Sequence, residues 1–213
     1  MGQTIATLAK RDPDVEIVAQ CDRDDSIDNG MKQCQVAIDF SAAGAVEEIC
    51  SLAAQHKRPL VIGTTGHSAE QKSFIQSTAR SIPIVFASNF SVGVNTLFWL
   101  TGKAAKLLGK NFRAEIVETH HVMKKDAPSG TAKTLAEILK AEQKEPEIPV
   151  RSIREGEVVG EHTVIFYGPG ERLELIHRAQ SRETFATGAL AAAKWVVSKP
   201  AGLYSMQDVL GLT

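Results

Sequence analysis

The chain has 213 residues, of which 43% are hydrophobic and 23% are charged, a balance typical of a folded globular protein. Its formal net charge of −1 offers no basic face for nucleic acid, so we expect a small-molecule partner. Three cysteines without a C-x-x-C spacing favour reduced thiols and a cytoplasmic location over a disulfide framework. No apolar run approaches the roughly 20 residues of a membrane helix, so we expect neither membrane insertion nor secretion.

The first part of the chain alternates short apolar runs with helical patterns. After an amphipathic helix at the start, strands are predicted at 15–21, 36–40, 60–62 and 82–87. This alternation favours an α/β fold with a Rossmann-like, doubly wound parallel sheet. Ser68 and Gln71 have the spacing of a capping box, which predicts a helix start after the third strand.

Polar or glycine-containing segments lie at the ends of all four predicted strands. They are Asp22-Arg23, Asp39-Phe40, Gly63-Thr64-Thr65 and Ser88-Asn89. Because ligands bind at the carboxyl ends of parallel strands, four such segments together predict a nucleotide crevice. Taken alone, the glycine–threonine segment more often marks an ordinary turn, and Asp22-Arg23 is as typical of a solvated loop.

The pattern changes after Ser91. Helical character up to Leu108 is followed by a strand through 115–118, a helix at 131–143, three further strand-like segments, and a helix at 183–197. This order favours a second, α+β domain with an open mixed sheet. We therefore expect a nucleotide-binding domain at 1–89 and 182–213, incomplete at its N-terminus, and a substrate-binding and assembly domain at 90–181.

Two histidines, a lysine and a helix start lie close together between Glu115 and Thr131. The helix start at Ser129-Gly130-Thr131 provides unpaired N–H groups and partial positive charge, so it predicts a carboxylate or phosphate site. Adjacent strand residues face opposite sides, so His120 and His121 share a site only if the strand ends between them, as we expect.

Other interpretations of these residues stay open from the residues alone. A lone pair of adjacent histidines is more often structural than catalytic. Zinc binding is disfavoured, because there is no H-E-x-x-H motif and no third ligand at a recognisable spacing, so no metal is expected. Lys124 is also compatible with a solvated charge beside Lys125, and we expect Asp126 to shape the loop or pair with a lysine.

Residues 115–132 match the pattern E-h-x-E-x-H-H-x-x-K-x-D-A-P-S-G-T-A, where h is apolar. In this the sequence resembles bacterial dihydrodipicolinate reductases, enzymes of lysine biosynthesis. The resemblance extends through 61–66, 87–93, 160–162, 170–174 and 181–182, essentially the whole chain. It implies NADH- or NADPH-dependent reduction of 4-hydroxy-tetrahydrodipicolinate to tetrahydrodipicolinate in the diaminopimelate route.

The resemblance also implies roles for individual residues. His120 is expected as the general acid and Lys124 as its catalytic partner, with His121, Gly130 and Thr131 binding the dicarboxylate substrate. The expected cofactor contacts are Asp22, Arg23, Gly63, Thr64, Thr65, Ala87, Ser88, Asn89 and Phe90. An aspartate suits a ribose 2′-hydroxyl and an arginine a 2′-phosphate, so the cofactor is NADH or NADPH. The family further implies a homotetramer built through the sheet of the second domain.

The start of the chain departs from the family pattern, which begins with a strand and a G-x-x-G-x-x-G loop. Here Met1-Gly2 stands where that loop ends. Two hypotheses follow. Either a longer natural chain precedes this start, which we favour, or the protein is a catalytically impaired short form that acts in ligand binding or assembly. The intact histidine cluster favours the reductase.

Overall fold

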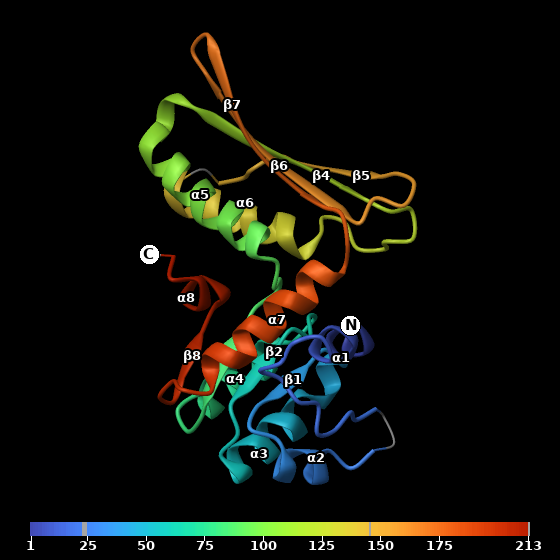
Figure 1. The fold of residues 1–213 in the computed structure, drawn as a ribbon. Coiled ribbons are helices and arrows are strands. Elements are labelled where there is room, and N and C mark those ends of the chain that lie inside the picture. Colours follow the sequence, from blue (N-terminus) through green and yellow to red (C-terminus); the bar gives the residue numbers. More distant parts are fainter. Residues whose placement is uncertain (23–24, 145, 213) are drawn as a thin grey trace. The chain divides into compact units, whose positions relative to one another are not determined.

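A computed structural model describes residues 1–22, 25–144 and 146–212. The chain forms two compact units, Met1–Ser91 with Glu183–Thr213, and Val92–Arg182. Each unit has its own sheet and its own hydrophobic core (Figure 1). Among the described residues, no helix is long and apolar enough to cross a bilayer.

The first unit is built on a four-stranded parallel sheet with the order β1-β2-β3-β8. Its elements are α1 (Gly2–Ala9), α2 (Ile27–Gln33), β1 (Ala37–Asp39), the 3-10 helix η1 (Ala43–Ala45), α3 (Val46–His56), β2 (Leu60–Ile62), α4 (Ala69–Thr78), β3 (Pro83–Phe86), α7 (Glu183–Val196), β8 (Gly202–Tyr204) and α8 (Met206–Leu210). The predicted doubly wound parallel sheet is therefore confirmed. The capping box is also present, because Ser68 Oγ accepts from Gln71 N at 3.3 Å and Gln71 Oε1 accepts from Ser68 N at 2.9 Å.

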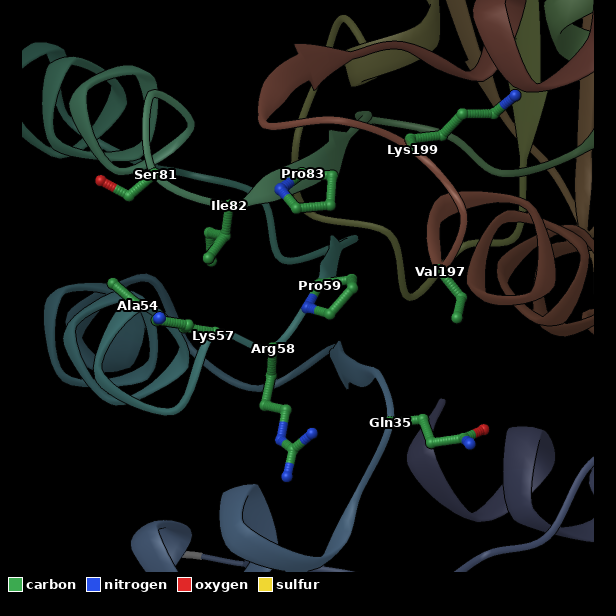
Figure 2. Close-up of a pocket in the computed structure, with 10 residues that line it drawn as sticks. All are labelled: Gln35, Ala54, Lys57, Arg58, Pro59, Ser81, Ile82, Pro83, Val197 and Lys199. Atoms are coloured by element: carbon green, nitrogen blue, oxygen red, sulfur yellow. The ribbon is translucent and has the colours of Figure 1, made fainter.

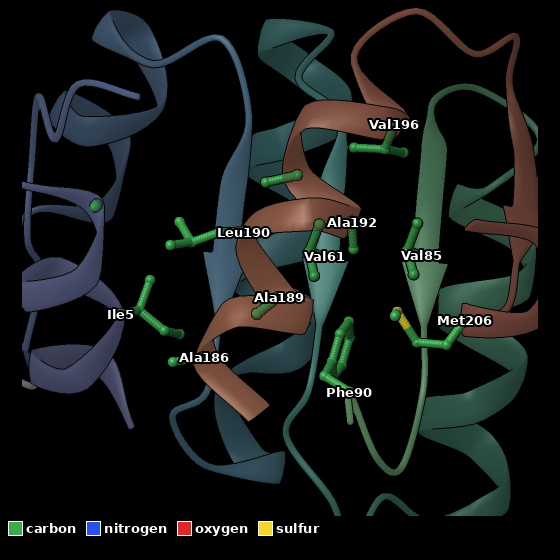
Figure 3. Packing of buried hydrophobic residues seen from close by; sticks show 12 residues of the cluster. Ile5, Val61, Val85, Phe90, Ala186, Ala189, Leu190, Ala192, Val196 and Met206 are labelled. Atoms are coloured by element: carbon green, nitrogen blue, oxygen red, sulfur yellow. The ribbon is translucent and has the colours of Figure 1, made fainter. Parts of the chain in front are cut away.

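Helices cover both faces of this sheet, which explains the unbroken apolar runs in its strands. Leu60, Ile62 and Ile84 belong to a cluster with residues of α3 and α4. Val61 and Val85 point to the other face, where they pack with the alanine-rich helix α7 (Figure 3). Small residues in α7 allow a close approach, since a Cβ at Gly188 would lie 1.7 Å from the carbonyl oxygen of Phe90.

The prediction of a strand at 15–21 is wrong. These residues form neither helix nor strand, although Val15 and Ile17 still pack against the core that contains Val61. An alternating apolar pattern reports which side chains are buried, whereas a strand also requires a neighbour that pairs with its backbone. In the described sheet order, no strand pairs with this segment.

The second unit is a four-stranded mixed sheet with the order β5-β4-β6-β7. Its elements are α5 (Val92–Leu108), the 3-10 helix η2 (Gly109–Asn111), β4 (Arg113–His120), α6 (Gly130–Gln143), β5 (Val150–Arg154), β6 (Gly160–Gly168) and β7 (Glu171–Ala179). β4 pairs with β5 in parallel and with β6 antiparallel, which confirms the mixed sheet. α5 and α6 lie on one face of the sheet and bury a core around Ile116, Leu135 and Phe166 (Figure 1).

Candidate active site

Apart from Asp22 and Arg23, the predicted cofactor residues of the first unit lie at the carboxyl ends of β2 and β3. Two backbone hydrogen bonds join these ends to their neighbours: Gly63 N donates to Asp39 O at 2.8 Å, and Ala87 N donates to Ile62 O at 3.2 Å. The ends of β1, β2 and β3 therefore meet at one edge of the parallel sheet, where α/β proteins bind nucleotides. Thr65 and Ser88 are exposed at this edge, and Asn89 accepts from Ser91 N through Oδ1 at 2.8 Å.

Packing against Phe40 explains why residue 63 is a glycine. A Cβ at this position would lie 2.2 Å from Cζ of Phe40, so the ring of Phe40 occupies the space beside the glycine. Phe40 in turn contacts Phe90, with ring centroids 5.5 Å apart. The side chain of Phe90 is buried in the core, which leaves its backbone as the part that can contact a ligand.

Several buried polar atoms at this edge have no hydrogen-bond partner among the described residues. They are Oδ2 of Asp39, Oγ1 of Thr64 and Nε2 of His67. Burial also lowers the pKa of His67, although the charge of Asp39 opposes the shift. An unpaired buried polar group costs about 1–3 kcal/mol, so these atoms suit a site that a polar ligand completes. The residues present thus fit a dinucleotide. His67 is a member of this site that sequence reasoning did not identify.

The predicted Asp22-Arg23 pair is only partly described. Asp22 is exposed, and its backbone N–H donates to Oδ2 of Asp25 at 2.7 Å. Arg23 lies outside the described residues. The proposed choice between a ribose hydroxyl and a 2′-phosphate therefore rests on the sequence.

A hollow in the first unit lies at the amino ends of the strands, opposite the predicted cofactor residues (Figure 2). Its lining includes Gln35, Pro59 and Pro83, which precede or open β1, β2 and β3. In Figure 2, the side chains of Arg58 and Lys199 extend away from each other. Because the amino ends of parallel strands are not where nucleotides bind, we do not assign the cofactor to this hollow.

In the second unit, the histidine cluster is built on β4. Its even-numbered residues from Ala114 to His120 are buried, so Glu118 and His120 share the face that packs on the helices. β4 ends at His120, as predicted, and the chain then turns, with His121 N donating to Val158 O at 2.7 Å. His120 is buried whereas His121 is only partly so.

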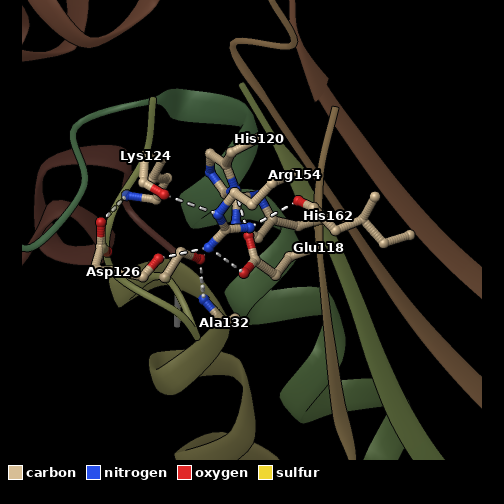
Figure 4. A network of polar contacts seen from close by, with 9 residues as sticks. Glu118, His120, Lys124, Asp126, Ala132, Arg154 and His162 are labelled. Carbon is tan, nitrogen blue, oxygen red and sulfur yellow. Dashed lines mark hydrogen bonds and ion pairs between the residues drawn. The ribbon is translucent and has the colours of Figure 1, made fainter. Parts of the chain in front are cut away.

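Glu118 is fully buried and lies at the centre of a polar network (Figure 4). In the sheet register it lies opposite Ser152 of β5 and His162 of β6. Its Oε2 contacts Nδ1 of His120, and its Oε1 accepts from Nη2 of Arg154 at 3.0 Å. Burial alone would raise the pKa of Glu118, but hydrogen bonds from Ser152 and Arg154 and the nearby positive charges lower it.

The surroundings of His120 act on its protonation in opposite directions. Burial lowers the pKa of His120, and the charge and hydrogen bond of Glu118 oppose that shift. The positive charges of Lys124 and Arg154 lower it further. Glu118 is therefore the group that favours the protonated form of His120 at this buried position.

The start of α6 is held by a histidine that the sequence pattern did not single out. Ser129 is the N-cap of α6 and accepts from Ala132 N at 3.2 Å. Nε2 of His162 lies 3.1 Å from Ser129 Oγ. Burial lowers the pKa of His162 to about 3, so this ring is neutral around neutral pH. Gly130 is exposed, and a Cβ there would meet nothing within 4 Å, so the helix start is open to a ligand.

The loop between β4 and α6 carries Lys124, whose Nζ lies 2.8 Å from Oδ1 of Asp126. This ion pair is one of the two roles expected for Asp126. Arg154 holds the same loop, donating through Nε to Lys124 O at 3.2 Å and through Nη2 to Asp126 O at 2.5 Å. Arg154, like His162, becomes apparent only through strand register, because it lies beside His120 on the neighbouring strand.

The donor atoms of Glu118, His120 and His162 all lie within 4.8 Å of one another. Sequence reasoning found no third ligand for zinc because His162 lies on a different strand. However, Glu118 already accepts from Arg154, and a guanidinium cation 3.0 Å from its carboxylate opposes a second cation there. Ser129 contacts His162 Nε2. We therefore interpret the group as a hydrogen-bonded network.

Comparison with known proteins shows which family this chain resembles. Residues 1–90 match the family model described as dihydrodipicolinate reductase, N-terminus, and residues 93–210 match its C-terminus. The 4-hydroxy-tetrahydrodipicolinate reductase of Akkermansia muciniphila is 47% identical over 232 residues, covering 100% of this chain and 94% of that protein. The enzyme of the same name from Aquifex aeolicus is 44% identical over 255 residues, covering 100% and 95%.

A solved structure has the same fold. It is a dipicolinate-bound dihydrodipicolinate reductase from Paenisporosarcina sp. TG-14, with a TM-score of 0.81 and 24% identity, covering 98% of this chain and 94% of that one. Family membership is established by two family models, which together span nearly the whole chain, and by relatives above 40% identity. The chain belongs to the dihydrodipicolinate reductase family, whose members are nicotinamide-dependent oxidoreductases.

Proposed function

We propose that this protein reduces 4-hydroxy-tetrahydrodipicolinate to tetrahydrodipicolinate in the diaminopimelate route of lysine biosynthesis. Membership of the family supports the reaction class. The observation that carries the proposal is the buried pair of Glu118 and His120 beside the open start of α6. This pair places a titratable imidazole next to a site suited to a carboxylate.

His120 acts as the general acid. A nicotinamide cofactor supplies the hydride for reduction of the conjugated imine. His120 then supplies the proton that the electron-rich product requires, and a well-placed general acid contributes about 10²–10⁴ in rate. Glu118 stabilises the protonated form of the ring, because it is a buried anion in contact with Nδ1.

Lys124, His121 and the start of α6 bind the substrate. Lys124 neutralises a carboxylate and stabilises the charge that develops in the transition state. The backbone N–H groups of Gly130 and Thr131 belong to the first turn of α6, where they favour an anion. The open space around Gly130 supports this role, because no side chain of the described residues fills it.

The cofactor is bound by the strand ends of the first unit. Gly63, Thr64 and Thr65 follow β2, and residues 87–90 follow β3. The buried Oγ1 of Thr64 supports this assignment, since it has no hydrogen-bond partner among the described residues. Either NADH or NADPH serves as cofactor, because an aspartate at position 22 suits the ribose hydroxyl of the first and an arginine at position 23 suits the 2′-phosphate of the second.

The protein works in the cytoplasm as a homotetramer assembled through the sheet of the second unit. Support comes from β7, the edge strand of that sheet, on which Leu173 and Ile176 are exposed apolar side chains. An exposed apolar edge strand favours association with another copy.

Turnover of the purified chain tests the proposal. Freshly generated substrate is mixed with NADH or NADPH, and cofactor oxidation is compared with the tetrahydrodipicolinate formed. We expect the two to agree in stoichiometry. A folded chain that binds both ligands without oxidising the cofactor would instead support the binding or assembly role, which none of the comparisons favours.

A further inference from the structure

We propose that Glu118 is a positioning residue, which holds Nδ1 of His120 so that Nε2 delivers the proton, and that Arg154 locks this pair to the loop of Lys124. The inference rests on the proposed function, because it takes His120 as the general acid. It assigns roles to two buried or half-buried residues outside the predicted set of catalytic and binding residues.

The two oxygens of Glu118 contact different partners. Oε2 contacts Nδ1 of His120, and Oε1 accepts from Nη2 of Arg154 at 3.0 Å (Figure 4). Glu118 and His120 are two residues apart on β4, so the pleat of the strand places them on one face. A carboxylate with both oxygens engaged and no solvent exposure has little freedom to rotate, so it fixes the ring that it contacts.

The opposite edge of the His120 ring is defined by Gly160 and His162. A Cβ at Gly160 would lie 3.1 Å from Nε2 of His120, so the glycine makes room for this edge. The ring of His162 packs edge-on, with its centroid 5.1 Å from that of His120. A flipped His120 would lose the carboxylate contact at Nδ1, and these neighbours offer no equivalent anion.

The proton transfer follows from this arrangement. The imidazolium carries protons on both nitrogens, and its Nδ1–H donates to Glu118. In the step itself the Nε2–H bond breaks, its electron pair stays on the nitrogen, and the proton moves to the substrate atom that gained an electron pair from hydride addition. The neutral ring that remains is the Nδ1–H tautomer, which still donates to Glu118. The lowered pKa of Glu118 keeps its carboxylate unprotonated throughout.

Arg154 joins this pair to the substrate loop. The guanidinium donates to Glu118 and also, through Nε and Nη2, to the carbonyl oxygens of Lys124 and Asp126. A planar guanidinium presents its donors in a fixed fork, so one side chain sets the distance between the acid and the loop. We therefore expect the placements of His120 and Lys124 to be coupled through Arg154.

The charges that face His120 come from every neighbouring element. They are Glu118 on β4, Arg154 on β5 and Lys124 on the loop, while His162 on β6 is neutral near neutral pH. Glu118 is the only anion among these four groups. Replacing it by glutamine keeps the shape but removes the charge, so the imidazolium becomes harder to form.

Glu118→Gln tests the inference through the pH dependence of kcat. A general acid must be protonated, so the rate falls as pH rises through its pKa. Lowering that pKa shifts the falling limb to lower pH, and we expect kcat to drop about 10²-fold at neutral pH, with KM and cofactor affinity little changed. Glu118→Asp retains the charge and should restore the limb to near its original pH. An unchanged pH profile in Glu118→Gln would overturn the proposal.

The control is Glu115→Gln. Glu115 lies on the same strand but an odd number of residues away, and its Oε1 accepts from the hydroxyl of Tyr167 at 2.7 Å. This variant makes the same chemical change on the other face of β4. We expect its pH profile to match that of the unmodified protein.

A second readout does not depend on turnover. Nitrogen-15 NMR of the histidine rings, with His120 assigned from the spectrum of His120→Ala, reports which ring nitrogen carries the proton. We expect the Nδ1–H tautomer for neutral His120 in the unmodified protein and in Glu118→Asp, and a shift towards Nε2–H in Glu118→Gln. If neutral His120 in the unmodified protein is the Nε2–H tautomer, the proposal is wrong, even if the enzyme is active. This measurement needs only the unmodified protein and His120→Ala, so it can be made even if Glu118→Gln does not fold. If the Nδ1–H tautomer is found but His120→Ala still turns over, the proposed function of His120 fails while its positioning stands.

Discussion

The buried carboxylates at the two candidate sites differ in how their oxygens are satisfied. At the strand ends of the first unit, buried atoms of Asp39, Thr64 and His67 have no partner among the described residues. In the second unit, Glu118 has a partner for each of its oxygens, although Nδ1 of the neighbouring His162 has none among the described residues. The difference indicates that the cofactor edge leaves a carboxylate oxygen of Asp39 for a ligand to complete, whereas the carboxylate of Glu118 is held by the protein itself.

Among the variants, His120→Ala is expected to have the largest effect, and this effect is on kcat. We expect His120→Ala to lower kcat by about 10²–10⁴-fold, the usual contribution of a general acid. Cofactor affinity should be unchanged, because the substitution lies in the other unit. Steady-state rates together with calorimetric titration of NADPH measure both quantities. His56→Ala, which removes a histidine paired with Asp28 in the first unit, is the control. A retained rate in His120→Ala would remove this residue from the mechanism.

The second expected effect is on stability. Arg154→Ala leaves Glu118 buried without its guanidinium partner, and breaking such a pair costs about 3–5 kcal/mol. Because the side chain of Arg154 is 20% exposed, solvent screening reduces this cost, and we expect a loss of about 2–4 kcal/mol. Urea unfolding measures the loss.

The matched control is Arg172→Ala. Arg172 pairs with Glu174 at 2.8 Å but is 58% exposed, so its removal should change stability by less than about 1 kcal/mol. Equal losses in the two variants would mean that the Glu118 network does not organise the second unit.

Substitutions of two glycines, one in each unit, are expected to affect different quantities. Gly63→Ala would place a Cβ 2.2 Å from the ring of Phe40, and overpacking of this kind costs about 1–3 kcal/mol. Gly130→Ala meets nothing within 4 Å, so its stability should be nearly unchanged, while KM for the substrate rises because the methyl group crowds the helix start. Unfolding curves and steady-state kinetics separate the two effects. A destabilised Gly130→Ala with normal KM would contradict the anion site.

The last prediction is a pH dependence of stability. The pKa of His162 is lowered from 6.5 to about 3 in the folded protein, so the unfolded chain binds a proton that the folded one does not. The contribution of His162 is therefore fully present above pH 6.5 and is lost as pH falls towards 3. We expect His162→Gln to flatten the decline in urea midpoint over this window. An equally steep decline in the variant would mean that His162 titrates normally.

The sequence predicted most of the fold because apolar patterns and caps act locally. The end of β4 at His120, the capping box at Ser68 and the mixed sheet of the second unit are all confirmed. The segment at 15–21 was different, because its pattern is strand-like but strand formation depends on a pairing partner that a local pattern does not contain.

The candidate site was predictable only in part. His120 and the start of α6 lie in one continuous motif, so their proximity follows from the sequence. Arg154 and His162 reach the same site through strand register, which single-sequence patterns do not determine. The spacing of Glu118 and His120, two residues apart on a strand, was a usable signal for their pairing.

Hydrogen exchange with and without NADPH tests the contrast between the two units most directly. Backbone amides of residues 63–67 and 87–90 should gain protection when the cofactor binds, because ligand contacts complete that edge of the sheet. The amides of β4 and β5 around Glu118 and Arg154 should already be protected in the free protein and change little. Unchanged exchange at 63–67 in a protein that binds NADPH, or weak protection around Glu118 until ligand is added, would contradict this account.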